Sequence, residues 1–234
     1  MIQKKFTKIN QTQLKYRIRM SETQTIQFIR PFGPTIAKVT MPTEIIKALN
    51  DYVEKIIVDE KKIKELDHGS KLAGNVKQEF VLEKAFLESS GFLKFLGLSV
   101  SNWIKYSNKQ EIKNFNVMSS WIVRQFKHEY NPTHWHKGHV SGVGYLKVPE
   151  NMGEPKQKNK TTKNVNGKIE LIHGTRMFLC NSTMKITPKV GDFYFFPNYM
   201  MHTVYPFEDT DEERRSVSFN AMIDEVVYDV YGSA

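Results

Sequence analysis

Three histidines in the second half of the sequence have the residue type and spacing of metal ligands. His134 and His136 are separated by one residue in the segment HEYNPTHWHKGHVSGVGYLKVP, which spans residues 128–149. Residues i and i+2 of a strand point to one face, so both imidazoles can converge on one ion. His202 follows a short apolar stretch and a loop in residues 188–206, so a hairpin can return it to the same point. Neutral imidazoles suit iron, copper, nickel or zinc, and the spacing alone does not choose among these metals.

A second candidate site is a polar strand that could bind an anion. In ERRSVSFN, residues 213–220, Arg214 and Ser216 begin a row of alternating polar side chains, so one face of the strand would be polar. Arginine binds a planar carboxylate through two parallel hydrogen bonds, and a barrel interior would present this face to such a ligand. The alternative is a surface strand whose arginines pair with the acids at positions 208 to 212. A register shift of one residue would exchange Arg214 for Arg215.

The elements that must position these residues change in character along the chain. From residue 117 onward the pattern predicts short strands separated by Gly, Pro, Asn and Lys, without intervening helices. The strand-like runs are 118–126, 140–148, 168–172, 176–179, 184–187, 192–196, 202–205 and 215–223. About eight strands with no room for crossover connections imply an antiparallel sandwich or barrel, of which a jelly roll is the closed solution.

The first half of the chain has helical patterns. We expect one strand near residues 35–40, a helix after Pro42 with Thr43 as its N-cap, and a polar, irregular segment at 74–80. A second helical region covers residues 82–106 and is interrupted at Ser89-Ser90-Gly91. The predicted fold is therefore α+β. Residues 1–116 would form a supporting region of one strand and helices, and 117–234 a β-barrel core within one integrated domain.

Composition narrows the classes of protein. The 234 residues are 40% hydrophobic and contain one cysteine, Cys180, which excludes an internal disulfide and a thiolate metal cluster. No membrane-spanning stretch or signal peptide is evident, so we expect a cytoplasmic protein. The formal charge is +9, concentrated in residues 1–20 and 156–168. These runs could attract nucleic acid or an acidic protein, although a solvated tail and loop is the simpler interpretation.

The ordered set of motifs is similar to a known family. NPTHWH followed by SGVGYLKVP, then PKVGDFYFFP with His202, then ERRSVSFN, resembles the iron(II)/2-oxoglutarate-dependent dioxygenases. The nearest branch is the prolyl-hydroxylase-like oxygenases of bacteria and bacteriophages, and the resemblance covers residues 121–220. It implies a double-stranded β-helix, iron(II) and 2-oxoglutarate as cofactors with O2 as cosubstrate, and hydroxylation of a C–H bond with succinate and CO2 as co-products. A peptide or protein substrate, with prolyl hydroxylation as the first choice, is implied by analogy alone.

The resemblance also implies roles for individual residues near the cosubstrate. Arg214 with Ser216 would hold the distal carboxylate of 2-oxoglutarate, and Tyr145 would contact the same carboxylate. Arg124, on the preceding strand, is a weaker candidate for that pocket, and Arg215 takes the role of Arg214 if the register differs by one residue.

The implied metal ligands depart from the pattern of the family in one position. By the resemblance, His134, His136 and His202 would bind iron, but the family usually has Asp or Glu where His136 stands. A third neutral ligand would leave the iron one charge more positive. The missing carboxylate could instead come from Glu129 or Asp192, the nearest acids in the sequence.

Two other classes of function remain open. One is a cupin-type metalloenzyme with the same barrel and no 2-oxoglutarate, although the usual cupin glutamate after the histidine pair is missing. The other is a non-catalytic module that uses its basic runs to bind nucleic acid or an acidic protein. The loop at 150–167 follows the strand next to the histidine pair, and it could be a lid or an inert insertion. The oligomeric state has no signature in the sequence.

Overall fold

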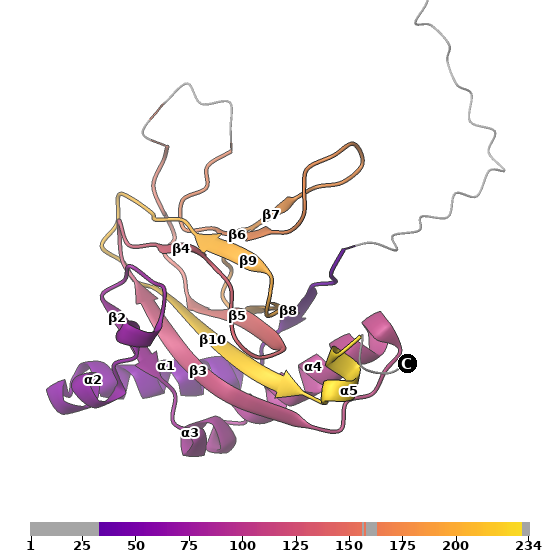
Figure 1. Ribbon diagram of the computed structural model, residues 1–234. Coiled ribbons are helices and arrows are strands. Elements are labelled where there is room, and N and C mark those ends of the chain that lie inside the picture. The colour runs from indigo at the N-terminus through magenta and orange to yellow at the C-terminus, as the bar shows by residue number, and fades with distance from the viewer. Residues whose placement is uncertain (1–32, 156, 158–162, 231–234) are drawn as a thin grey trace, which may run out of the picture. The chain divides into compact units, whose positions relative to one another are not determined.

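The computed structural model describes residues 33–155, 157 and 163–230. Its helices and strands alternate little, since most helices precede most strands (Figure 1). In chain order the elements are β1 (Ala37–Thr40), α1 (Thr43–Ile57), α2 (Glu60–Leu66), a 3-10 turn (Gly69–Lys71), β2 (Gln78–Val81), α3 (Lys84–Ser89), α4 (Phe92–Asn108), β3 (Phe115–Gln125), β4 (Asn131–His134), β5 (Val140–Lys147), β6 (Ile169–Ile172), β7 (Thr183–Ile186), β8 (Asp192–Pro197), β9 (Met201–Val204), β10 (Arg214–Ile223) and α5 (Glu225–Tyr228).

The strands form two antiparallel sheets. The larger sheet has the order β1-β8-β5-β10-β3-β2, and the smaller has the order β4-β9-β6-β7. Figure 1 shows the smaller sheet facing the larger one, with the helices on the far side of the larger sheet. The predicted α+β jelly roll is confirmed: the described residues form eight strands from β3 onward, the number predicted for that region, preceded by the expected β1 and by β2, which was not predicted.

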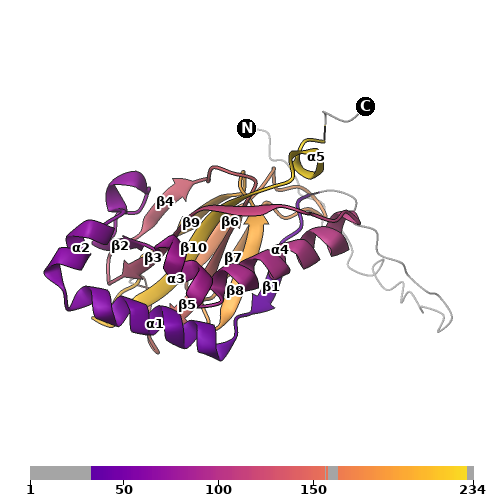
Figure 2. The same ribbon diagram turned by 90° about the horizontal axis from the view of Figure 1, so that it is seen from below.

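The helices cover one face of the larger sheet because their apolar residues fall on one side. In α1, Ile45, Leu49 and Val53 recur every four residues and are buried. Together with the apolar face of α4 they pack on aromatic side chains of the sheet, including Phe193 and Phe219, and α1 and α4 both run along the sheet in the view from below (Figure 2). Burial of each such side chain stabilises the fold by about 1.5–3 kcal/mol. This core makes the larger sheet a rigid support for the site.

The opposite face of the larger sheet looks into the space between the sheets. A smaller apolar cluster there includes Val143, Tyr145, Ile169 and Phe196. On β10, Val217 and Phe219 belong to the helix-side core, so the alternate residues of that strand face the interior. The predicted alternation of β10 therefore brings its polar face into the barrel.

Close approach of an aromatic ring explains one glycine of the central strand β5. A Cβ atom built on Gly144 would collide with the ring of Phe193 on the neighbouring strand β8. Only glycine leaves room for this ring, which lies in the main core.

Several local predictions were wrong at element ends and edges. Thr43 is the first residue of α1 and Pro42 occupies the N-cap position, where no side chain caps the helix. The segment 74–80, expected to be irregular, contributes the edge strand β2. The strand β4 was not predicted, and residues 176–179 form a turn closed by a Met177–Cys180 bridge rather than a strand.

The proposed division into residues 1–116 and 117–234 stays a prediction, while β1 and β2 from the first region pair with β8 and β3 of the barrel. The basic run at residues 1–20 lies outside the described residues, as do residues 156 and 158–162 of the second basic run. Within the described part of the chain, no helix is long and apolar enough to span a membrane.

Candidate metal centre and the adjoining anion pocket

The three predicted histidines come together at one end of the smaller sheet. His134 is the last residue of β4, and it lies directly opposite His202 of β9 in the antiparallel ladder. His136 lies two residues beyond the end of β4. Its backbone N–H donates a hydrogen bond to the carbonyl of Asn198 at 3.0 Å, which fixes this segment to the turn between β8 and β9. Strand pairing therefore positions the rings of His134 and His202, and the turn between β8 and β9 positions the ring of His136.

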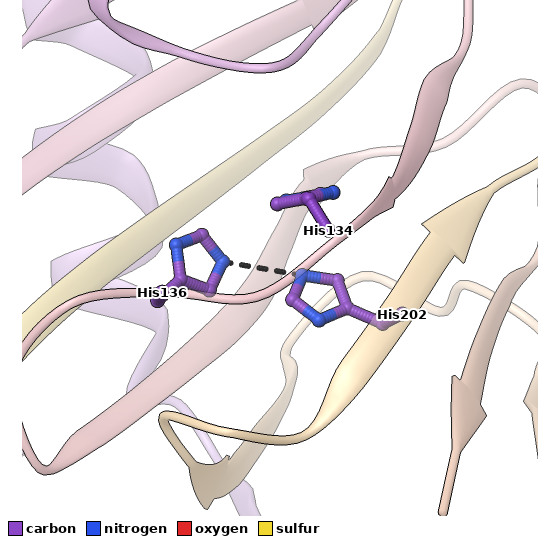
Figure 3. Close-up of side chains that lie close together, drawn as sticks. All are labelled: His134, His136 and His202. Carbon is purple, nitrogen blue, oxygen red and sulfur yellow. Dashed lines mark hydrogen bonds between the residues drawn. The ribbon is translucent and has the colours of Figure 1, made fainter.

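Figure 3 shows the three rings close together, with a ring nitrogen of His136 directed at a ring nitrogen of His202. One ring nitrogen from each histidine lies within 4.8 Å of the other two. The Nε2 atoms of His136 and His202 are 3.1 Å apart. These separations are short enough for one ion to contact all three nitrogens. Among the described residues, no other group of His, Cys, Asp or Glu has this geometry.

Backbone carbonyls select the tautomers of two rings. The Nδ1 atom of His134 lies 2.7 Å from the carbonyl oxygen of Pro132, and that of His202 lies 2.9 Å from the carbonyl oxygen of Met200. A carbonyl only accepts, so each Nδ1 carries the proton and donates. The Nε2 atoms of both rings then keep free lone pairs, which is how metal-binding histidines are usually oriented.

The electrostatics of the cluster keep the imidazoles neutral. Burial lowers the pKa of His134. Burial, reinforced by the neighbouring histidines, lowers the pKa of His136 to about 3 and that of His202 to about 4. All three rings are therefore unprotonated at neutral pH, and their lone pairs are available to a cation.

The two acids suggested as substitute ligands are held elsewhere. The Glu129 carboxylate accepts hydrogen bonds from the backbone N–H groups of Lys77 and Phe126, at 3.1 and 2.9 Å. Asp192 forms an ion pair with Lys38 at 2.8 Å. Neither acid belongs to the histidine cluster, so the three donors at this point are all imidazoles.

Arg214 points into the interior beside the cluster. Its guanidinium is buried, and it lines one small cavity together with the three histidines and Ser216. Its Nη1 donates to the Oε1 of Gln125 at 2.9 Å, and Gln125 is itself held by donating to the carbonyls of Glu129 and Tyr205. The Nε of Arg214 has no hydrogen-bond partner. No acidic side chain of the described chain is seen to pair with this buried cation.

Tyr145 lies next to this arginine on the same interior face. Its ring is 5.1 Å from the guanidinium carbon of Arg214, and it pairs in register with Ser216. The hydroxyl is buried and has no hydrogen-bond partner. Burial raises the pKa of Tyr145 to about 12, so it stays a neutral donor. The interior face beside the cavity thus carries a cation and a hydroxyl donor, both without an anionic acceptor.

The remaining arginine candidates lie on the opposite face. Arg215 binds Glu213 and Glu54, with nitrogen–oxygen distances of 2.6 to 2.8 Å. Arg124 pairs directly with Arg215 in the ladder and also binds Glu213, at 2.8 Å. The suggestion that Arg124 lines the anion pocket was therefore wrong, and the fallback register with Arg215 inside does not occur.

Two residues of this region were missed by sequence reasoning. Gln125, which orients Arg214, follows an apolar strand and carries no motif. Glu79 is a buried acid on the edge strand β2, in the segment expected to be irregular. The segment QEFV reads polar, polar, apolar, apolar, so it gave no period-two signal that could have identified the strand or Glu79.

One family model matches part of the chain. Residues 119–220 match the model of a family described as "Putative 2OG-Fe(II) oxygenase", where 2OG is 2-oxoglutarate. This match spans the chain from β3 to β10. No curated protein matches the sequence.

Solved structures are similar in fold. One is the viral collagen prolyl hydroxylase of Paramecium bursaria Chlorella virus-1 in complex with 2-oxoglutarate, with 16% identity, TM-score 0.51, and coverage of 80% of this chain and 94% of that one. Another is a Pseudomonas putida prolyl-4-hydroxylase, with 14% identity, TM-score 0.50, and coverage of 79% and 91%. A third is the α-ketoglutarate-dependent epimerase SnoN of nogalamycin biosynthesis, with 13% identity, TM-score 0.52, and coverage of 85% and 86%.

Proposed function

We propose that this chain, which belongs to the 2OG-Fe(II) oxygenase superfamily, is a hydroxylase in which His134, His136 and His202 hold the iron and Arg214 holds 2-oxoglutarate. The observation that carries the proposal is that two incomplete groups, one from each sheet, line the same interior cavity. Three neutral imidazoles lack a cation, and a buried arginine beside them lacks an anion. Iron(II) and 2-oxoglutarate, the cofactors of the superfamily, complete both.

The donor set fits iron(II). Imidazole nitrogen is a common ligand of iron, and three such donors on one side leave the remaining positions free for 2-oxoglutarate and O2. The carbonyls of Pro132 and Met200 hold the free Nε2 atoms of two ligands inward. Because all three ligands are neutral, the metal would carry a full two positive charges, which favours binding of a dianionic cosubstrate.

The pocket beside the metal fits the distal carboxylate of 2-oxoglutarate. The Nε of Arg214 and the Tyr145 hydroxyl are buried donors without acceptors, and an unpaired buried cation is costly. A carboxylate accepting from both groups would remove that cost. Ser216 adds a second hydroxyl, and thus a third donor, at the same level of the sheet. The cavity has a volume of about 40 Å³ and shares His134 and His136 with a larger cavity of about 360 Å³.

When bound, iron(II) and 2-oxoglutarate would react with O2, so that one oxygen atom would enter a substrate C–H bond and the other would leave in succinate, with CO2 as the second co-product. The part of this chain is to orient and to shield. Gln125 positions the guanidinium of Arg214, and the apolar side chains of Val143, Ile169 and Phe196 line the cavity and restrict water. Exclusion of water strengthens the electrostatic contacts to the cosubstrate.

A peptidyl substrate, and prolyl hydroxylation in particular, is the substrate class we propose. Its support is the similar fold of the viral collagen prolyl hydroxylase and the Pseudomonas putida prolyl-4-hydroxylase. A cytoplasmic location is also proposed. An exposed free thiol at Cys180 suits a reducing compartment.

The competing functions predict different behaviour. A cupin-type metalloenzyme would leave Arg214 and Tyr145 without a purpose. A nucleic-acid-binding module would bind without iron, and its affinity would fall steeply with salt. Nothing in the described interior favours either function.

The proposal is tested by turnover. Protein reconstituted with iron(II) is incubated with 2-oxoglutarate, O2 and proline-containing peptides, and succinate and a peptide mass increase of one oxygen atom are measured. We expect succinate formation that requires iron, with stoichiometric hydroxylation of the preferred peptide. Succinate formation that does not require iron, or no succinate above the metal-free control, would contradict the proposal.

A further inference from the structure

Glu79 is a buried acid that the fold leaves without compensation. The residue is 1% exposed, and neither carboxylate oxygen has a hydrogen-bond partner in the described structure. Buried polar groups are almost always paired, and an unpaired buried carboxylate is costly. Such an acid is expected where a ligand supplies the missing partner.

The sheet directs Glu79 to the same side as the proposed cosubstrate site. Glu79 of β2 pairs with Val123 of β3, Val123 pairs with Ser216 of β10, and Ser216 pairs with Tyr145 of β5. Residues directly opposite in adjacent strands project to the same face. Glu79 therefore lies at the outer edge of the row that contains the anion pocket, on the strand that ends the sheet in Figure 1.

A large cavity connects this acid with the histidine cluster. It has a volume of about 360 Å³, and its lining includes Glu79, His134 and His136. Trp121, His136 and His68 also line this cavity. The Trp121 ring lies between the two histidine rings, 5.6 Å from that of His136 and 6.4 Å from that of His68. A molecule in this cavity would contact Glu79 at one end and approach the metal site at the other.

The charges around Glu79 do not neutralise it. Burial, together with the nearby carboxylates of Asp67 and Glu129, raises the pKa of Glu79 to about 7. Two lysines, Lys71 and Lys137, line the cavity, but their side chains are exposed and form no ion pair with Glu79. The site therefore favours a cation or a strong hydrogen-bond donor from outside the chain.

We propose that Glu79 is the recognition site for a cationic group of the substrate, an ammonium or a guanidinium, next to the residue that is oxidised. This inference rests on the proposed function, because it assigns the 360 Å³ cavity to the substrate. The aromatic faces of Trp121 and Trp135 line the same cavity and suit a cation. The substrate class is thus a peptide with a lysine, an arginine or a free amino group close to the hydroxylated position.

A structural role for Glu79 predicts a different result. The loop after the 3-10 turn closes over the carboxylate, since a Cβ built on Gly74 would lie 2.9 Å from its Oε1. If Glu79 held this loop, Glu79→Gln would lower the unfolding temperature. If Glu79 is kept for a ligand, the neutral amide removes an uncompensated charge and raises that temperature.

The test measures binding of peptide pairs to the anaerobic protein loaded with iron(II) and 2-oxoglutarate. Each pair has a central proline and differs only in lysine against norleucine, placed at each of the neighbouring positions in turn. Calorimetry gives the affinity ratio for wild type, Glu79→Gln and the control Glu88→Gln, which removes the same charge from an exposed position of α3. The visible absorption of the iron–cosubstrate complex is recorded in the same samples.

We expect the lysine peptide to bind wild type about tenfold more tightly at one position or more, as one charge-assisted hydrogen bond would give. The ratio should fall below about twofold in Glu79→Gln and persist in Glu88→Gln. A ratio unchanged by Glu79→Gln, no lysine preference at any position, or loss of iron from Glu79→Gln would overturn the inference. Absence of the visible band in wild type would instead contradict the proposed function.

Discussion

Arg214 and Arg215 are neighbours on one strand and have opposite environments. Both are buried, at 2% and 1% exposure. Arg215, on the face toward α1, binds two carboxylates, of Glu213 and Glu54, and the amide oxygen of Asn50. Arg214, on the interior face, has one neutral partner, Gln125, and an unpaired Nε.

Two buried acids, Glu213 and Glu79, differ in the same way: the first is paired with cations and the second is not. Burial opposes ionisation of Glu213, but hydrogen bonds from Arg215 and Arg124 outweigh it and lower its pKa to about 2. Burial raises the pKa of Glu79 to about 7, with no cation to offset it. The charges of Arg215 and Glu213 on the helix side are therefore compensated within the fold, whereas those of Arg214 and Glu79 on the interior face are left for ligands. We interpret the first set as structural and the second as functional.

The largest expected effect is on the metal site. His202→Ala removes a ligand with a prepositioned Nε2, so iron retention should be lost and succinate formation should fall to the level of the metal-free protein. The matched control is His173→Ala, at an exposed position outside the cluster. Metal analysis measures the iron content of both variants, and a succinate assay measures their turnover. Retained iron with normal turnover would remove His202 from the ligand set.

The second-largest expected effect is a loss of stability when the ion pairs of Glu213 with Arg124 and Arg215 are removed. Glu213→Gln leaves two buried arginines under-compensated and should destabilise the fold on the order of 3 kcal/mol at pH 7. The folded-state pKa of about 2 lies below the usual value of 4.5, so this contribution is present above about pH 4.5 and is lost as the pH falls toward 2. Urea unfolding of wild type and variant at pH 7 and pH 3 measures it.

The exposed neighbour Glu212→Gln serves as the control and should change stability little at either pH. A difference between Glu213→Gln and wild type that did not shrink at low pH would mean that the ion pairs are not its cause.

Arg214→Ala separates the two faces most clearly. It should weaken 2-oxoglutarate binding about 10- to 100-fold, since charge-assisted hydrogen bonds to the carboxylate are lost, and leave iron binding unchanged. Arg215→Ala should instead reduce stability and leave the cosubstrate affinity of the folded protein nearly unchanged. Titration of the iron-loaded variants with 2-oxoglutarate tests both statements, and the reverse pattern would exchange the roles of the two faces.

The smallest expected effect is a gain of stability. Glu79 has a folded-state pKa above its usual 4.5, so its charge destabilises the fold increasingly as the pH rises from about 4.5 to 7. Glu79→Gln should therefore stabilise the protein at pH 8 on the order of 2 kcal/mol, and hardly at pH 4. Thermal unfolding at the two pH values measures the difference. A loss of stability at pH 8 would identify Glu79 as part of the structural set.

Much of the site could be predicted because its residues occur in recognisable local sequence patterns. The alternation in ERRSVSFN separates Arg214 from Arg215 without knowledge of the fold, and a histidine pair before a strand indicates a metal. The jelly roll followed from short strands with no helices between them. These inferences need only residues close together in the sequence.

The remaining features depend on pairing between distant segments. Arg124 lies with Arg215 because β3 and β10 are in that particular register, which no local pattern sets. The edge strand β2 has only four residues and no alternation of polar and apolar side chains, so it could not be recognised, and Glu79 was missed with it. Thr43 resembled an N-cap, but Pro42 has the extended backbone that precedes the helix.

The central claim is that the unpaired interior groups hold iron(II) and 2-oxoglutarate together, with three histidines and no carboxylate ligand. Its most direct test is the visible spectrum of wild-type protein titrated with iron(II) and 2-oxoglutarate under anaerobic conditions. We predict retained iron and the weak charge-transfer band of the chelate, present with both components and lacking with either one alone. If the band does not form and no iron is bound, the assignment of these interior groups to iron(II) and 2-oxoglutarate is contradicted.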